Sequence, residues 1–138
     1  MMTRKRSRAA FVLLLSCIAT TGVAHHNGNL YFDGEITVEM KNATVVSLVL
    51  VNPHSRLEFT IVNEDGELEE WSAETQSQNA LRRKGIRPDM VEAGDVVTVI
   101  GNPSRKGTDY LRMRQLILPN GDTVTFYGSG PAITPASP

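Results

Sequence analysis

The chain has three histidines, and their positions make a transition-metal site the first chemistry to consider. His25 and His26 are adjacent, and His54 follows a proline at the end of an apolar run. If a leader is removed after Ala24, His25 offers its α-amine and its imidazole to the same ion. With a further imidazole from His54, these nitrogen donors suit Cu(II), which prefers nitrogen ligands in square-planar geometry. His25, His26 and His54 are therefore candidate metal ligands; no cofactor is established, and copper is the candidate ion.

His54 also has a purely structural interpretation. Pro53 cannot donate a hydrogen bond to a strand ladder, so it ends the preceding strand and places His54 in a turn. In that turn, His54 or Asn52 would cap local backbone groups. The metal hypothesis therefore requires that His54 lie near the start of the mature chain.

A second candidate site is basic. Arg82, Arg83 and Lys84 end a predicted helix, where cations complement the helix dipole and remain in solvent. The alternative is a partner-binding surface that also includes Arg105 and Lys106 of a later loop. On that hypothesis the partner is a protein of the periplasm.

The sequence contains none of the common catalytic motifs. It has no G-x-S-x-G nucleophile motif, no phosphate-binding glycine loop and no dinucleotide fingerprint. A Ser/His/Asp triad would need His54, but Ser55 is only its neighbour in sequence. Most carboxylates fall on the expected solvent faces of strands. We therefore predict that the protein is not an enzyme; an enzyme would need a pocket lined by carboxylates.

Residues 1–24 have the features of a secretory signal peptide. Four basic residues precede an apolar run over 9–19, and small residues at 22 and 24 suit cleavage after Ala24. The apolar run is far shorter than the roughly 20 residues of a membrane-spanning helix. We therefore predict a periplasmic or secreted protein with no transmembrane segment in its mature form.

The same leader contains the only cysteine of the chain, Cys17. The segment LLSC (14–17) resembles a lipoprotein cleavage site, but Leu15 is bulky for its position and the apolar segment before Cys17 is short, so we expect no lipid anchor. Cleavage after Ala24 removes four of 14 basic and none of 15 acidic residues, which leaves a net charge of −5 with histidine neutral. Such an acidic domain is a poor candidate for nucleic-acid binding, and it has no cysteine for a disulfide.

The mature chain is dominated by strand patterns. Strands are predicted at 35–40, 44–51, 56–62, 95–101, 110–118 and 122–127. Another strand leads into Trp71, with a bulge or a frayed strand start near Glu69. One helix is predicted over 75–85, with Thr75 or Ser77 as its N-cap and Gly85 after its last turn. Asp65-Gly66 and Asn120-Gly121 predict tight turns.

This order favours a mainly β fold: a small, OB-like, partly closed barrel with one short helix between the third and fourth main strands. A β-sandwich is the alternative. We predict a signal peptide at 1–24, an N-terminal arm at 25–34, a barrel domain at 35–127 and a disordered Pro/Gly/Ser-rich tail at 128–138.

Five short motifs carry a resemblance to a family of small exported bacterial proteins, a domain of unknown function. They are AHHN (24–27), NPHS (52–55), WSAE (71–74), LRRKG (81–85) and GDVVTVIGNP (94–103). Asn27 stands where the family usually has serine, and Leu50 where it often has an aromatic residue. The resemblance implies a periplasmic, β-rich, OB-like domain and assigns no activity.

Taken together, these features predict an exported binding or interaction module. Copper or another transition metal bound through the mature N-terminal histidines is the alternative function.

Overall fold

A computed structural model describes residues 28–137. The elements, in chain order, are η1 (Gly28–Leu30), β1 (Val38–Val49), β2 (Arg56–Val62), β3 (Leu68–Glu74), α1 (Gln78–Arg83), η2 (Pro88–Met90), β4 (Val96–Pro103), β5 (Tyr110–Ile117), β6 (Thr123–Thr125) and β7 (Ile133–Thr134). The predicted leader with Cys17, and the predicted ligands His25 and His26, lie outside the described residues. Within 28–137, no helix is long and apolar enough to cross a membrane.

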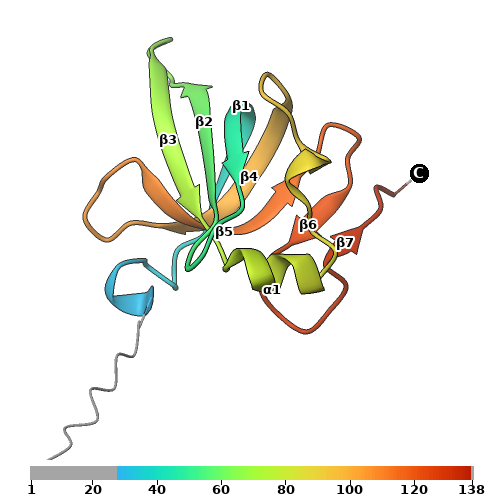
Figure 1. Ribbon diagram of the computed structural model, residues 1–138. Coiled ribbons are helices and arrows are strands. Elements are labelled where there is room, and N and C mark those ends of the chain that lie inside the picture. The colour runs from blue at the N-terminus through green and yellow to red at the C-terminus, as the bar shows by residue number, and fades with distance from the viewer. Residues whose placement is uncertain (1–27, 138) are drawn as a thin grey trace, which may run out of the picture.

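The first five strands form a closed barrel. Their order in the sheet is β3-β2-β1-β4-β5, and a parallel pairing of β3 with β5 joins the two ends (Figure 1). The single short helix follows β3 and precedes β4. The prediction of a mainly β, OB-like barrel is confirmed, and the barrel is fully closed rather than partly closed. The β-sandwich is excluded, because one sheet closes on itself instead of two sheets packing together.

The close approach of β4 and β5 depends on Gly101. The register of these two strands shifts between Ile100 and Gly101, and the glycine is buried. A Cβ at position 101 would overlap the backbone carbonyl of Arg112 on the neighbouring strand. Glycine therefore allows the two backbones to approach at the point where the sheet bends.

The strands differ from the predicted ones in two places. The segments 35–40 and 44–51 form one strand, β1, which bends where Asn42 adopts a φ of 55° and the register against β4 shifts. The bulge predicted near Glu69 is wrong, because β2 and β3 pair without a shift from Arg56↔Glu74 to Val62↔Leu68. Glu69 and Glu70 break the alternation of hydrophobicity before Trp71 without breaking the ladder.

The helix is shorter than the predicted span of 75–85. Ser77 is its N-cap and accepts a hydrogen bond from the Ala80 N–H at 3.3 Å, whereas Thr75 is buried. Gly85 adopts a φ of 76°, and the Ile86 N–H donates to the Leu81 carbonyl at 3.0 Å. The helix therefore ends at glycine as predicted.

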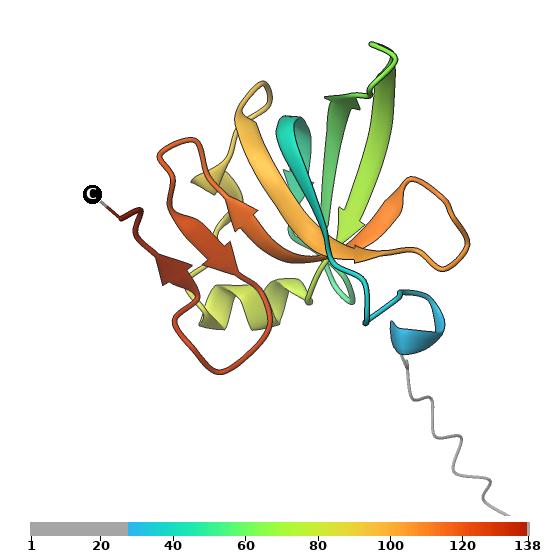
Figure 2. The ribbon, with the colours of Figure 1, turned by 180° about the vertical axis from the view of Figure 1, so that it is seen from behind.

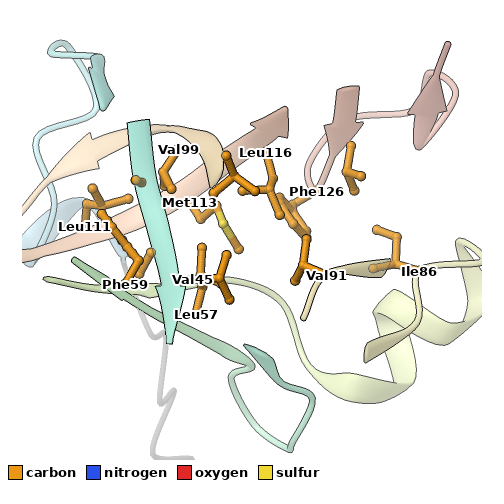
Figure 3. Packing of buried hydrophobic residues seen from close by; sticks show 14 of the residues in the cluster. Val45, Leu57, Phe59, Ile86, Val91, Val99, Leu111, Met113, Leu116 and Phe126 are labelled. Atoms are coloured by element: carbon orange, nitrogen blue, oxygen red, sulfur yellow. The ribbon is translucent and has the colours of Figure 1, made fainter. Parts of the chain in front are cut away.

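A continuous hydrophobic core fills the barrel and extends toward the helix. Figure 3 shows Phe59, Leu111 and Met113 inside the barrel, with Phe126, Val91 and Ile86 continuing toward α1. Trp71 is partly buried and packs against this core, and its indole N–H donates to Glu69. Leu81 and Ile86 are at most 1% exposed, so the core also anchors the ends of the helix.

The segment after β6 is ordered, although the sequence predicts a disordered tail. Ile133–Thr134 pairs with β6 (Figure 2). Lys84 at the helix end donates to the carbonyls of Phe126 at 2.6 Å and Gly128 at 3.4 Å. A composition rich in proline, glycine and serine does not reveal these pairings, which depend on groups far away in the sequence.

Candidate functional site

A pocket of about 600 Å³ opens at one end of the barrel. It gathers residues from the N-terminal arm, the β1–β2 turn, the end of β3, the β4–β5 loop, β5 and the segment after β6. Its walls are Gly28, Tyr31, Phe32, His54, Glu74, Ser104, Lys106, Thr108, Tyr110, Arg112 and Tyr127. The pocket is therefore built from segments that are far apart in the sequence.

One wall is the N-terminal arm, which Arg105 holds against the β4–β5 loop. The Arg105 Nε donates to the carbonyls of Asn29 at 3.0 Å and Phe32 at 3.2 Å. Its guanidinium also pairs with the carboxylate of Asp33 at 3.4 Å. Phe32 is 3% exposed and forms a β-bridge with Ser104. These contacts fix the course of the arm along the rim of the pocket.

Ser55 holds in place the turn that carries His54. This serine is fully buried, and its hydroxyl exchanges hydrogen bonds with the backbone of Val51 at 3.2 and 3.3 Å. The Ser55 N–H donates to the Gln76 carbonyl, and the Thr75 N–H donates to the Ser55 carbonyl. His54 therefore lies in a turn after Pro53, as predicted, and the hydroxyl that bonds to the backbone of this turn belongs to Ser55.

Glu74 links His54 to Tyr110 inside the pocket. Its Oε2 accepts a hydrogen bond from the Tyr110 phenol at 2.6 Å, and its Oε1 lies 3.7 Å from the His54 Nδ1. Burial raises the pKa of the Tyr110 phenol, and the hydrogen bond to the Glu74 carboxylate raises it further. Tyr110 therefore stays protonated and acts as a donor.

Arg112, the register partner of Glu74 on β5, adds a cation to the pocket. The Arg112 guanidinium lies 5.0 Å above the centre of the Phe32 ring. A Cβ at position 28 would overlap the Arg112 guanidinium, so glycine lets the arm pass close to it. Burial raises the pKa of Tyr127, although the Thr75 hydroxyl and the charge of Arg112 act to lower it. Arg112 is thus a positive charge that lies against the arm.

The predicted metal ligands are divided between the pocket and the undescribed part of the chain. His54 and Gly28 line the same pocket, so the arm reaches the side of the barrel on which His54 lies. No cluster of three or more His, Cys, Asp or Glu residues suited to a metal occurs between residues 28 and 137. A shared metal site would therefore depend on His25 and His26.

The predicted basic surface is not continuous. In both ribbon views the β4–β5 loop, with Arg105 and Lys106, lies across the molecule from the end of α1 (Figures 1 and 2). Lys84 and Arg105 make the intramolecular hydrogen bonds described above. Arg82 and Arg83 are exposed, and Arg82 borders a second hollow, of about 610 Å³, with the Arg87–Asp89 ion pair.

Sequence reasoning missed most of the pocket. Four pocket residues lie in or beside strands whose polar positions alternate with core positions: Glu74, Tyr110, Arg112 and Tyr127. In the sequence, this alternation does not distinguish them from ordinary solvent-facing residues. The parallel register Glu74↔Arg112 brings β3 and β5 together across a separation of 38 residues. Only knowledge of the closed barrel would have revealed this juxtaposition.

The architecture and the pocket place the molecule in a recognised structural class. A five-stranded closed barrel with a helix after its third strand is an OB-type barrel, and barrels of this type bind ligands beside the loops that join strands 1–2 and 4–5. The pocket lies between these two loops. The chain belongs to the Family of unknown function (DUF6152), whose model matches residues 12–111. No curated protein and no solved structure matches the chain.

Proposed function

We propose that the protein is an exported, non-enzymatic module that binds a small molecule in the pocket between the His54 turn and the 104–109 loop. The observation that carries this proposal is the convergence of polar and aromatic side chains from six separate segments on one hollow. A volume of about 600 Å³ is within the range of small-molecule sites, about 300–1,000 Å³.

The hydrogen bonding around His54 favours binding over nucleophilic catalysis. The Ser55 hydroxyl beside it in sequence is fully buried and is bonded to the backbone of Val51. Glu74 is held by Tyr110 and His54. These side chains are therefore arranged as a rigid recognition surface rather than as a nucleophile with its base.

Export is supported by the signal-peptide pattern of residues 1–24. The bacterial periplasm is the compartment that the family resemblance implies. Ligand capture in that compartment would involve the mature chain, which would begin at His25 and carry a net charge of −5.

The test is a small-molecule screen followed by two-dimensional amide NMR of the protein, exported with its own leader and isotopically labelled. We expect at least one class of fragment to shift the amides of Tyr31, His54, Tyr110 and Thr108. Variants Thr108→Arg and Tyr31→Ala change exposed pocket walls and should reduce these shifts. A screen in which no fragment perturbs these amides, or only perturbs those around Arg82 and Arg87, contradicts the proposal.

Copper binding is the second candidate function, and one observation favours it. Gly28 lines the pocket with His54, and His25 precedes Gly28 by only three residues. Three extended residues span about 10 Å, so the amine and imidazole of His25 are within reach of the pocket. His26 would add a third imidazole. Nitrogen donors of this kind suit Cu(II).

Cu(II) titration of the exported protein, with its N-terminus verified by mass spectrometry, tests this candidate. The matched control is a protein with one extra residue before His25, which keeps every imidazole but moves the free amine. We expect both this control and His54→Ala to weaken binding and to change the copper electron-paramagnetic-resonance spectrum. Equal binding by the wild type and both variants, or no binding at all, excludes the site.

A further inference from the structure

We propose that the pocket selects a ligand with an oxyanion group, a carboxylate or a phosphate, on a flat organic body. This inference rests on the proposed binding function and names the chemical class of the ligand. The observation behind it is an imbalance of charge among the pocket walls. Two permanent cations, Arg112 and Lys106, share the pocket with a single acid, Glu74.

Neither of these two cations, Arg112 and Lys106, is paired with a carboxylate in the part of the chain that the structure describes. Among residues 28–137, neither Arg112 nor Lys106 forms a salt bridge. By contrast, Arg105, which is next to Lys106, is paired with Asp33 and bonded to the arm. Arg105 therefore holds the N-terminal arm that forms one wall of the pocket. Arg112 and Lys106 line the pocket without a salt bridge to any described residue.

Arg112 is held in place before any ligand arrives. Its guanidinium is half-buried, stacks on the Phe32 ring and lies against Gly28. A guanidinium offers paired N–H donors that match the two oxygens of a carboxylate or phosphate. Because Arg112 is already ordered, little side-chain freedom would be lost when an oxyanion binds.

Glu74 does not neutralise these cations by direct contact. Its Oε2 is occupied by the Tyr110 hydroxyl at 2.6 Å, and its Oε1 faces the His54 imidazole at 3.7 Å. The acid is thus bonded to Tyr110 and faces His54, although Arg112 is its register partner on β5. An entering anion would meet the cations Arg112 and Lys106, which also line the pocket.

The other residues that line the pocket indicate what kind of organic group the ligand carries beside its oxyanion. Tyr31 is 57% exposed, and Tyr110 and Tyr127 are partly buried. Tyrosine faces favour flat, weakly polar groups by offset stacking or edge contacts. The hydroxyls of Ser104 and Thr108 supply further polar contacts along the loop.

The experiment compares four matched probes by calorimetry and amide NMR on the exported protein. Benzoate and phenyl phosphate carry the two oxyanions, benzamide is the neutral counterpart, and benzylamine is the cationic one. We expect benzoate, phenyl phosphate or both to bind about 10- to 100-fold more tightly than benzamide, the range given by one or two charged hydrogen bonds. Comparing the affinities of benzoate and phenyl phosphate shows whether the pocket prefers a carboxylate or a phosphate.

Variants then locate the selectivity. Arg112→Gln and the exposed Lys106→Gln should each remove most of the preference for the anion, while binding of benzamide changes little. Arg83→Gln removes the same charge from the far end of α1 and serves as the control. Because Lys106 lies in an exposed loop, we expect Lys106→Gln to fold normally. This variant therefore still tests the inference if Arg112→Gln fails to fold.

The outcomes separate this inference from the function on which it rests. Benzamide or benzylamine binding in the pocket as tightly as the anions overturns the oxyanion inference and leaves a binding module. Anion binding that survives both variants, or falls equally in Arg83→Gln, also overturns it. Failure of every fragment and probe to perturb the pocket overturns the proposed function itself.

Discussion

At the scale of single residues, the buried Tyr110 phenol and its hydrogen bond to Glu74 link the stability of the fold to pH. The phenol is held in its protonated form by burial and by the adjacent carboxylate, so its pKa is raised above the ordinary value of 10.0. The folded state therefore binds the phenolic proton more tightly than the unfolded state. This stabilisation is complete below the unfolded pKa and is lost as the pH rises above about 10.

Tyr110→Phe tests this linkage directly. In the wild type, the free energy of unfolding should fall steeply above about pH 10. In the variant this fall should be smaller, because the ionisable group is absent, and Tyr127 accounts for part of what remains. Denaturant unfolding at pH 8 to 11 measures the effect. Identical pH profiles for the two proteins would contradict the assigned contact.

The sequence could identify His54 as a residue of interest, but not its neighbours. Pro53 and the end of an apolar run mark the turn, and this prediction needs only local chemistry. Glu74 and Arg112 become neighbours through the β3–β5 pairing. Their positions along the strands carry no local signal, so the pocket could not be assembled from the sequence.

At the scale of elements, the N-terminal arm is held by a few contacts with the β4–β5 loop. The Asp33 N–H donates to the Pro103 carbonyl and the Arg105 N–H to the Tyr31 carbonyl, both at 2.9 Å. The side chain of Arg105 adds the bonds to Asn29, Phe32 and Asp33. This cluster places the arm on the rim, so it determines whether the pocket has its outer wall.

Arg105→Ala should release the arm while preserving the barrel. We expect the amides of Phe32, Asp33 and Arg105 to exchange with solvent faster, because the side-chain bonds that hold the arm are lost. The amides of the buried Val99 and Met113 should keep their protection. Lys106→Ala is the control in the same loop, since Lys106 contributes no side-chain bond to the arm. Equal exchange at the arm in both variants would contradict this role of Arg105.

The helix end is a second test at this scale. Ser77→Ala removes the acceptor for the Ala80 N–H and should cost about 1 kcal/mol of stability. Thr75 is the other N-cap that the sequence predicts, but it is buried instead. Ser77→Asp restores a capping acceptor and should recover the loss in chemical denaturation. Full stability of Ser77→Ala would show that this cap contributes nothing.

At the scale of the whole molecule, barrel closure determines where the site lies. The sequence predicted the barrel class because alternating strands, a single helix and short turns are consistent with one another. It did not predict that β1 is one bent strand or that residues after 128 return to β6, because both depend on contacts distant in sequence. The parallel pairing of β3 with β5 closes the sheet into a barrel, and the pocket lies at one end of this barrel.

Gly101→Ala tests the close approach of β4 and β5, two neighbouring strands of the barrel. The added Cβ would overlap the carbonyl of Arg112, so β4 and β5 must move apart. Forcing extra atoms into a packed interior costs about 1–3 kcal/mol, and we expect the melting temperature to fall accordingly. Gly34→Ala is the matched control, because a Cβ there meets only the Asn29 side chain at 3.8 Å. Equal melting temperatures for the two variants would contradict the close approach at Gly101.

We propose a ligand site in the pocket between the His54 turn and the 104–109 loop, with the anionic group of the ligand on Arg112. A crystal structure of the exported protein soaked with phenyl phosphate tests it most directly. We expect the phosphate on the Arg112 guanidinium, with the phenyl ring among Tyr31, Tyr110 and Tyr127. A phosphate bound instead at the hollow beside Arg82 and Arg87, or a pocket left without ligand in crystals saturated with phenyl phosphate, would contradict it.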